Sequence, residues 1–212
     1  QGVDCIRAKD GLLYAAAWNG AALKKRTSDL VRTDGGHSAA ILSVEGELTG
    51  FAFDAAGDVW LTQLTTAGGT LCRAKHDSWG AAVEQVVTQL DGAPLGAVSA
   101  VEVSPAGKVY FAVAAAAGAE NGLESALRTE LLAHTATGCV YVYDPAARTV
   151  EKVLGGVAGA AGLALSPDGS TLYVSDLGSR CIWAVPSGGR ERMAGGKGCA
   201  QLAAGLPGYP GA

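Results

Sequence analysis

The sequence lacks any long hydrophobic run, and it is poor in charged residues. Its longest apolar stretch, Val109–Ala119, has 11 residues, whereas a helix needs about 20 to cross a bilayer. We therefore expect no membrane-spanning segment. The formal net charge is −4 and the isoelectric point is near 5.3. This acidic balance argues against a nucleic-acid groove or a polybasic membrane surface.

Signatures of common chemistries are also missing. No serine lies in a nucleophile-elbow context, so a Ser-His-Asp triad is unsupported. The glycine pairs Gly155-Gly156 and Gly195-Gly196 lack a following Lys-Ser/Thr and are not phosphate loops. The 3 histidines are isolated along the chain: His37, His76 and His134. Neither Asn19 nor Asn121 lies in a glycosylation triplet, so the sequence gives no positive sign of secretion.

Glycine is abundant, with 31 residues, and 49% of the chain is hydrophobic. These values indicate a compact, turn-rich domain that is long enough to bury a substantial core. The clearest stretch is Val157–Val185, which alternates short apolar runs with tight turns. In its Ser-Pro-Asp-Gly turn the proline presets φ and Gly169 tolerates a positive φ. We predict antiparallel strands here, because the run is too rich in glycine and proline for a helix.

The same pattern occurs three more times, at Phe51–Thr62, Val101–Val113 and Cys5–Ala17. The turn glycines Gly11, Gly57, Gly107 and Gly169 recur at intervals of 46, 50 and 62 residues. An all-strand repeat of this length is typical of the blades of a β-propeller. We therefore predict an all-β propeller of four-stranded blades, in preference to an unrelated β-sandwich.

We place the four blades at about residues 1–47, 48–97, 98–155 and 156–203 of a single domain, 1–212. In the first blade we expect the third strand at Ala21–Lys25, a polar stretch at 26–38 and the last strand near Ala40–Val44. In the last blade we expect a loop at Pro186–Gly198 and an outer strand at Cys199–Ala203.

One insertion lengthens the third blade. In Glu120–His134 the residues Leu123, Leu127 and Leu131 recur every four positions, with Ala126 on the same side. This spacing predicts an amphipathic helix with those leucines buried. It either packs over a blade edge or forms a lid over the central opening.

The 5 cysteines show no metal-binding spacing. Cys72, Cys139 and Cys181 each open a predicted third strand, so they lie in different blades and are too far apart to pair. We expect buried thiols, with a single disulfide as the alternative.

Several motifs resemble the strictosidine synthase-like proteins. The matching segments are LTGFAFDAAGDVWLT, VVTQLDGAPLGAVSAVEVSPAGKVYFAV, ELLAHTATG, TGCVYVYDPAARTVEKVLGGVAGAAGLALSPDGSTLYVSD and AAGLPGYPGA. The relatives of that family include gluconolactonase- and paraoxonase-like hydrolases. The resemblance implies a six-bladed propeller, of which this chain would supply about four blades. A chain that opens at Gln1 and stops at Pro-Gly-Tyr-Pro-Gly-Ala is then expected to be a processed product or a fragment.

The resemblance also implies a calcium ion on the propeller axis, held by Glu, Asn and Asp side chains. The corresponding positions in this sequence are Gln1, Ser99, Ala100, Ala161, Gly211 and Ala212. Calcium takes six to eight oxygen ligands, preferably with carboxylates among them. Because these residues offer no carboxylate, we expect the metal site to be lost and no cofactor to be needed.

Two functional hypotheses follow. The first is a binding or scaffold propeller without metal chemistry, whose partner is another protein or the remaining blades. The second is a hydrolase, or a lyase of the strictosidine synthase type, acting on a small organic substrate in the central channel. Asp176, just after a predicted strand, is the best-placed candidate for a catalytic base, although a turn-capping aspartate is the commoner case. The resemblance slightly favours the secretory pathway or an organelle lumen.

Overall fold

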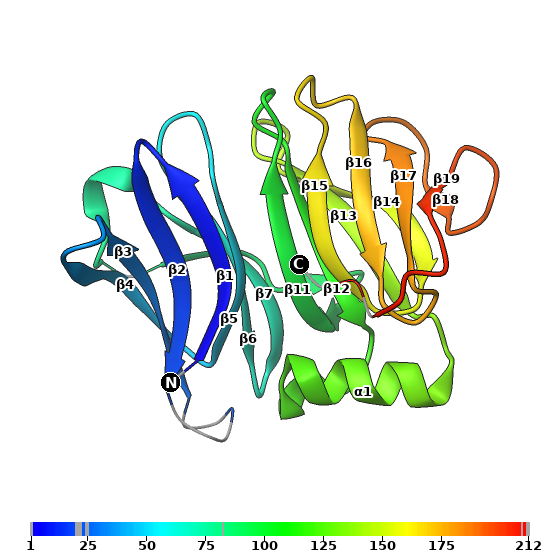
Figure 1. Cartoon of the computed structure of the whole chain (residues 1–212), viewed down its shortest axis with the longest axis horizontal. Helices are drawn as coiled ribbons and strands as arrows, with labels where there is room; N and C mark the ends of the chain where they lie inside the picture. Colours follow the sequence, from blue (N-terminus) through cyan, green and yellow to red (C-terminus); the bar gives the residue numbers. More distant parts are fainter. Residues whose placement is uncertain (1, 20–22, 24–25, 82, 209, 211–212) are drawn as a thin grey trace.

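The computed structural model describes residues 2–19, 23, 26–81, 83–208 and 210. These residues form four sheets, each built on four antiparallel strands and one of them extended by a short fifth strand, arranged side by side as propeller blades with one α-helix across one end (Figure 1). The predicted all-β propeller is therefore confirmed. No helix in this part of the chain is long and apolar enough to cross a membrane.

Each blade is a meander whose first strand is innermost. The first blade contains β1 (Gly2–Lys9), β2 (Leu12–Asn19), β3 (Thr27–Thr33) and β4 (Ser38–Glu45). The second contains β5 (Glu47–Phe53), β6 (Val59–Thr65), β7 (Gly68–Ala74) and β8 (Glu84–Val87). The third contains β11 (Ala97–Val103), β12 (Val109–Ala115), β13 (Gly138–Asp144) and β14 (Thr149–Val157). The fourth contains β15 (Ala160–Leu165), β16 (Thr171–Asp176), β17 (Cys181–Pro186) and β19 (Ala200–Ala203).

The repeated turn glycines close the hairpins between the first two strands of the blades. All four have positive φ, between 70° and 85°: Gly11, Gly57, Gly107 and Gly169. In the fourth blade the Gly169 N–H donates to the Ser166 carbonyl at 2.8 Å, and the same bond closes the turn at Gly107. A residue with a side chain is strained at such a φ, so glycine here sets where each hairpin turns.

The core consists of apolar layers between successive blades, as expected for a propeller. Phe51 of β5 is fully buried against the first blade, and Val101 of β11 is buried against the second. Leu163 and Leu165 of β15 pack against the third blade but are only partly buried. All five cysteines are free.

The first blade departs from the sequence-based prediction. Its third strand is Thr27–Thr33, within the stretch expected to be a polar loop. The predicted strand Ala21–Lys25 lies almost wholly outside the described residues; Leu23, its one described member, is not in a strand. The prediction was wrong because the polar residues of β3 were taken to indicate a loop, whereas in the structure they belong to a strand. Ser28 is buried, donates to the Gly46 carbonyl at 2.9 Å and accepts the Leu48 N–H at 3.1 Å.

The loop after β17 also contains structure that was not predicted. Within Pro186–Gly198 the short strand β18 (Arg192–Met193) pairs in parallel with β14 of the neighbouring blade. Two short strands, β9 (Gln89–Leu90) and β10 (Ala93–Pro94), form a separate hairpin between the second and third blades. The expected outer strand of the fourth blade is confirmed as β19.

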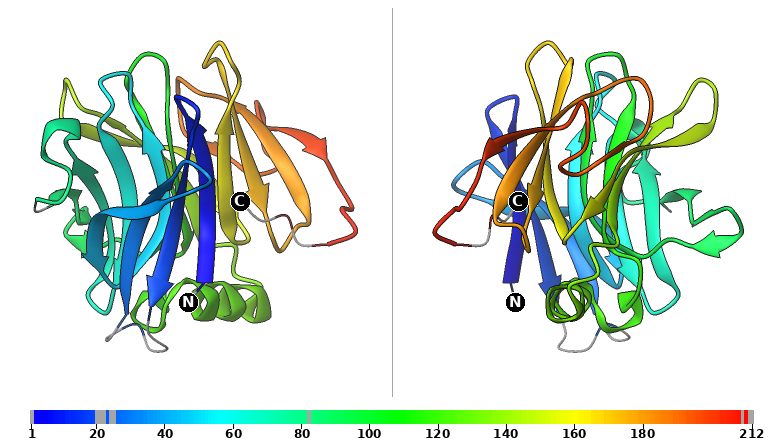
Figure 2. Two further views of the ribbon diagram at one scale, coloured as in Figure 1. Left: turned by 60° about the vertical axis from the view of Figure 1, so that its left-hand side comes forward. Right: turned by 90° about the vertical axis from the view of Figure 1, so that its right-hand side faces the viewer.

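The inserted helix, α1 (Leu123–Ala133), follows a single turn at Ala119–Asn121 and lies across one end of the blades (Figure 2). The prediction that its leucines are buried is only partly right, because Leu123, Leu127 and Leu131 are half-buried. The buried residues of the helix are Ala126 and Glu130. The helix thus adds Ala126 to the core between the second and third blades, with Leu123 packed against it.

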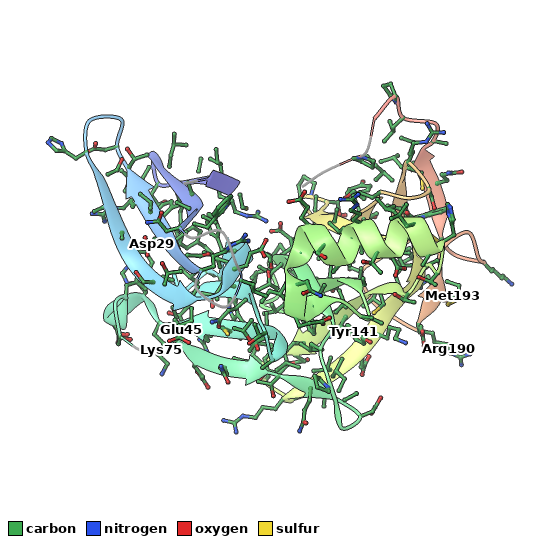
Figure 3. The ribbon with its side chains drawn as sticks, turned by 90° about the horizontal axis from the view of Figure 1, so that it is seen from below. Asp29, Glu45, Lys75, Tyr141, Arg190 and Met193 are labelled. Atoms are coloured by element: carbon green, nitrogen blue, oxygen red, sulfur yellow. The ribbon has the colours of Figure 1, made fainter. Side chains whose placement is uncertain are left out.

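The four blades form an open ring, seen along its axis in Figure 3. The faces of the first and fourth blades that look into the opening have no neighbouring sheet. Ile6 and Leu13 on the first blade are 65% and 49% exposed, and Leu202 on the fourth is 61% exposed. Among the described residues, no sheet covers these apolar side chains at the two ends of the ring.

Candidate functional site

The inner strands line the axis of the ring, and each carries a β-bulge at the same point. The pairing register shifts between Val3 and Cys5 and at the three corresponding places in the other blades. A bulge inserts one unpaired residue and re-aims the backbone. The bulged residues are Asp4 on β1, Thr49 on β5, Ser99 on β11 and Ala161 on β15. This ring of four equivalent positions is the axial site.

The hydroxyl groups at the axial site already make hydrogen bonds within the protein. The buried Ser99 Oγ donates to the carbonyl oxygen of Ala160 at 2.6 Å, which ties the third blade to the fourth. Thr49 Oγ1 donates to the Thr62 Oγ1 at 2.9 Å. Ala161 contributes no polar side-chain atom. The inner strands also lie close together, since a Cβ added at Gly50 would be 3.1 Å from the Ala100 Cα.

Three of the site positions expected from sequence, Ser99, Ala100 and Ala161, lie on these inner strands. The other three, Gln1, Gly211 and Ala212, are outside the described residues. Sequence reasoning missed two members of the axial site, Asp4 and Thr49. The repeat itself contains the signal, because Thr49 lies eight residues before its turn glycine, as Ser99 does, and Asp4 lies seven residues before Gly11.

An arginine crosses the channel from the first blade to the third. Arg7 of β1 donates through Nη2 to the Val101 carbonyl at 3.2 Å and pairs with Glu102 Oε2 at 2.9 Å. Its Nε is buried and has no acceptor among the described residues. Arg7 lies three residues beyond the bulge of its strand. Three residues of an extended strand span about 10 Å, so the Arg7–Glu102 ion pair lies along the inner strands but apart from the axial site.

The donor set at three of the four axial positions does not suit the calcium ion that the family resemblance implies. At these bulges, whose side chains the structure describes, Thr49 and Ser99 offer neutral hydroxyls that are already hydrogen-bonded and Ala161 offers none, whereas calcium prefers several oxygens that include carboxylates. Within the described part of the chain, no cluster of three or more His, Cys, Asp or Glu side chains could hold a metal.

Asp176, the candidate base, is completely buried at the end of β16. Its Oδ2 accepts the Trp183 indole N–H at 2.9 Å, and its Oδ1 accepts the Ser179 N–H at 2.9 Å. Both oxygens are thus engaged in holding a turn and a core tryptophan. A catalytic role for Asp176 stays a prediction, and the axial site does not include it.

The radial arrangement of four-stranded sheets defines the chain as a β-propeller protein. A family model described as the SMP-30/gluconolactonase/LRE-like region matches residues 82–209. Because this match covers more than half of the sequence, the chain belongs to that family. The predicted gluconolactonase-type relationship is thereby confirmed. None of the curated protein sequences compared with the chain matches it significantly.

Solved structures support the same fold. A putative gluconolactonase is similar to the chain with a TM-score of 0.64 and 16% identity, over 99% of this chain and 71% of that one. A gluconolactonase from Xanthomonas campestris has a TM-score of 0.64 and 21% identity, over 94% and 68%. A luciferin-regenerating enzyme has a TM-score of 0.65 and 17% identity, over 98% and 64%. The chain thus spans about two thirds of the length of these proteins.

Proposed function

We propose that this propeller binds a small molecule or a protein partner in its channel without an axial calcium ion of its own. The observation that carries the proposal is the composition of the axial site. Engaged hydroxyls and an alanine occupy three bulges, and the charge of Arg7 is balanced by Glu102. A site of this kind favours neutral groups over a divalent cation.

Calcium calorimetry tests this proposal. We expect no binding at micromolar calcium and negligible hydrolysis of gluconolactone, both for this chain and for any longer protein that contains it. Micromolar calcium binding by the unmodified protein, abolished by a chelator, would overturn the proposal.

A second candidate is a lactonase-type hydrolase, and two observations favour it. The chain belongs to a family named for gluconolactonase, and Asp4, a carboxylate residue, occupies the bulge of the first blade. One acidic residue supplies both a ligand and a charge, and additional blades would supply others. If this function is correct, Asp4→Asn removes calcium-dependent lactone hydrolysis, whereas Asp10→Asn in the adjacent turn does not.

We further propose that additional blades cover the two open sheet faces. The faces are apolar and belong to the two ends of the ring, where the family fold continues with further sheets of the same kind. These blades come from the same polypeptide or from a partner chain. Without them the channel is open on one side, so the whole protein's substrates depend on residues outside this chain.

A further inference from the structure

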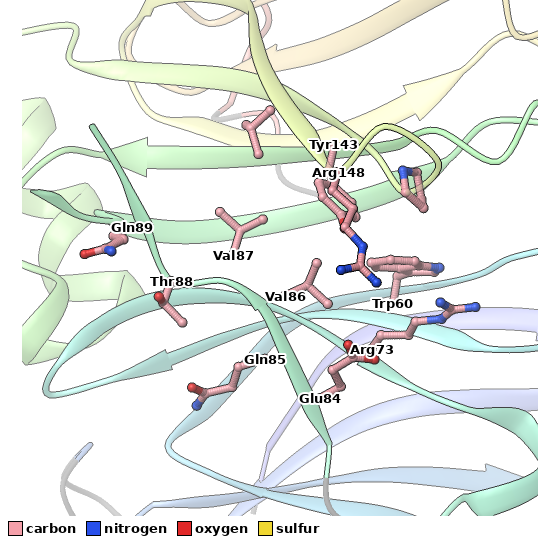
Figure 4. Close-up of a pocket in the computed structure, with 12 residues that line it drawn as sticks. Trp60, Arg73, Glu84, Gln85, Val86, Val87, Thr88, Gln89, Tyr143 and Arg148 are labelled. Carbon is pink, nitrogen blue, oxygen red and sulfur yellow. The ribbon is translucent and has the colours of Figure 1, made fainter. Parts of the chain in front are cut away.

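A second cavity, of about 510 Å³, lies away from the axis, between the outer strands of the second and third blades (Figure 4). The indole of Trp60 and the ring of Tyr143 lie on its inner side, with their centroids 5.8 Å apart. Val86 of β8 and Val150 of β14 add apolar walls. The rest of the lining is polar, with Gln85, Thr88 and Gln89 beside two arginines and a glutamate, and the volume is in the range of small-molecule sites.

One guanidinium of the cavity is held in a fixed position. Arg73 donates from Nε to Asp58 Oδ2 at 2.9 Å, and its Nη2 lies 2.6 Å from the same oxygen. Its guanidinium carbon lies 5.2 Å from the centre of the Trp60 ring. Asp58 is itself fixed, because its Oδ1 accepts the His76 N–H at 2.8 Å. Arginine has five N–H donors in a rigid fork, so Arg73 keeps donors available for a ligand.

A second guanidinium comes from the opposite blade. Arg148 lies in the β13–β14 turn with a φ of 55°, and its N–H donates to the Asp144 carbonyl at 2.7 Å. Asp144 Oδ1 also accepts the N–H groups of Ala146 and Ala147, which holds the turn rigid. In Figure 4 the Arg148 side chain points toward Trp60. Among the described residues no carboxylate lies within ion-pair distance of it.

We propose that this cavity binds a small planar anion, such as an aromatic carboxylate. The two guanidiniums would hold the carboxylate, and Val86 and Val150 would contact the flat apolar part, since Trp60 and Tyr143 are only 2% and 9% exposed and form the floor. Arg73 is already paired with Asp58, whereas Arg148 has no carboxylate partner among the described residues, so an anion beside Arg148 gains an ion pair that the free protein lacks. Of the described residues that line the cavity, Glu84 alone is acidic. It pairs with neither arginine, and its negative charge would compete with that of the ligand for this positive region.

Calorimetry with 2-naphthoate tests the proposal, with 2-naphthylmethylammonium as a ligand of the same ring and opposite charge. We expect 2-naphthoate to bind and the cation not to bind. Arg148→Gln should weaken binding about tenfold, as expected for loss of a charge-assisted hydrogen bond. Glu84→Gln should tighten binding severalfold, because it removes the competing carboxylate.

The matched control is Arg180→Gln. Arg180 is also an exposed arginine in a hairpin turn, with a φ of 49°, but it lies in the fourth blade. Its substitution should leave the affinity for 2-naphthoate unchanged.

Arg148→Gly is a second variant that relieves the positive φ, so it should lose affinity without a lower melting temperature. The proposal is overturned if 2-naphthoate does not bind at millimolar concentration, if the cation binds more tightly, or if Arg148→Gln and Arg180→Gln behave alike. Because the cavity is separate from the channel, these results do not depend on the calcium experiment.

Discussion

At the scale of single residues, two aspartates, the buried Asp176 and the half-buried Asp54, each hold a tryptophan and a turn. Asp176 holds the Trp183 indole in the fourth blade, and Asp54 holds the Trp60 indole at 3.0 Å in the second. In both cases the other oxygen accepts backbone N–H groups of an adjacent turn. The same arrangement in two blades indicates a structural use of these carboxylates.

We expect Asp176→Ala to lower the free energy of unfolding by about 2–3 kcal/mol, because it leaves the buried Trp183 and Ser179 N–H groups without acceptors. Urea denaturation measures the change. Asp77→Ala, at an exposed aspartate that holds no buried group, is the control and should change stability little. Loss of a catalytic activity with unchanged stability would instead support the catalytic hypothesis for Asp176.

The turn of the fourth blade contains a titrating group with a shifted pKa. The Ser166 hydroxyl, followed by the Ser170 N–H and hydroxyl, lowers the pKa of Asp168 to about 2. A pKa that is lower in the folded state stabilises the fold above the ordinary value. That contribution is lost as the pH falls from about 4 through about 2.

We therefore predict that Ser166→Ala raises the pKa of Asp168 toward its ordinary value. The variant should then lose less stability than the unmodified protein as the pH falls from about 4 to about 2. Carbon-13 NMR of the Asp168 carboxyl group during an acid titration measures the shift. Ser187→Ala, which removes a neighbouring hydroxyl that donates to the Gly169 carbonyl rather than to Asp168, is the control. An unchanged pKa in Ser166→Ala would show that the hydroxyl is not the main cause.

At the scale of elements, polar contacts hold both ends of α1. At its start, Glu47 Oε2 accepts the Leu123 N–H at 3.3 Å and pairs with Arg26 Nη1 at 2.9 Å. At its end, the buried Glu130 accepts the hydroxyls of Thr135 and Thr137 at 2.9 and 2.8 Å, as well as the Thr137 N–H. A negative charge near a helix N-terminus is favourable. The helix is therefore fixed across the blade ends rather than poised as a free lid.

The helix also depends on its half-buried leucines. Leu127 packs over Gly159, where an added Cβ would lie 3.1 Å from the Leu127 Cδ2. We expect Leu127→Ala to cost about 1–2 kcal/mol, less than a fully buried leucine would. Leu132→Ala, at a side chain that is 74% exposed, is the control and should cost under about 0.5 kcal/mol. Equal effects in chemical denaturation would mean that the helix face is assigned incorrectly.

At the scale of the whole molecule, the ring has two ends with uncovered apolar faces. Ile6 and Leu13 lie on one of them, and Leu202 lies on the other. Apolar sheet faces of this kind promote association with other surfaces. We expect the 212-residue chain alone to self-associate as its concentration rises.

Sedimentation velocity measures this association. Ile6→Lys should reduce it, because the lysine adds charge at the centre of an exposed face. Leu132→Lys is the control, since it adds the same charge at an exposed leucine on α1, away from both faces. A chain that stays monomeric at high concentration, with or without Ile6→Lys, would show that the faces do not drive association.

Several features of this protein could be predicted from sequence because they depend on neighbours along the chain. The positive φ at Gly169 and the other turn glycines follows from local sterics, and it places the hairpins. The repeat of those turns then predicts the blades and the propeller. The helix bounds were close for the same reason, since the spacing of its leucines is local.

The remaining features depended on contacts between distant segments. Arg7 meets Glu102 across the channel, and Arg73 shares a cavity with Arg148 of another blade. No pattern along the chain encodes these pairs, because blade packing alone brings them together. The third strand of the first blade was missed because the hydrogen bonds of Ser28 to distant backbone make polar residues acceptable in a buried strand. Sequence by itself therefore determined the blades and their turns, while tertiary packing decided which charges share a site.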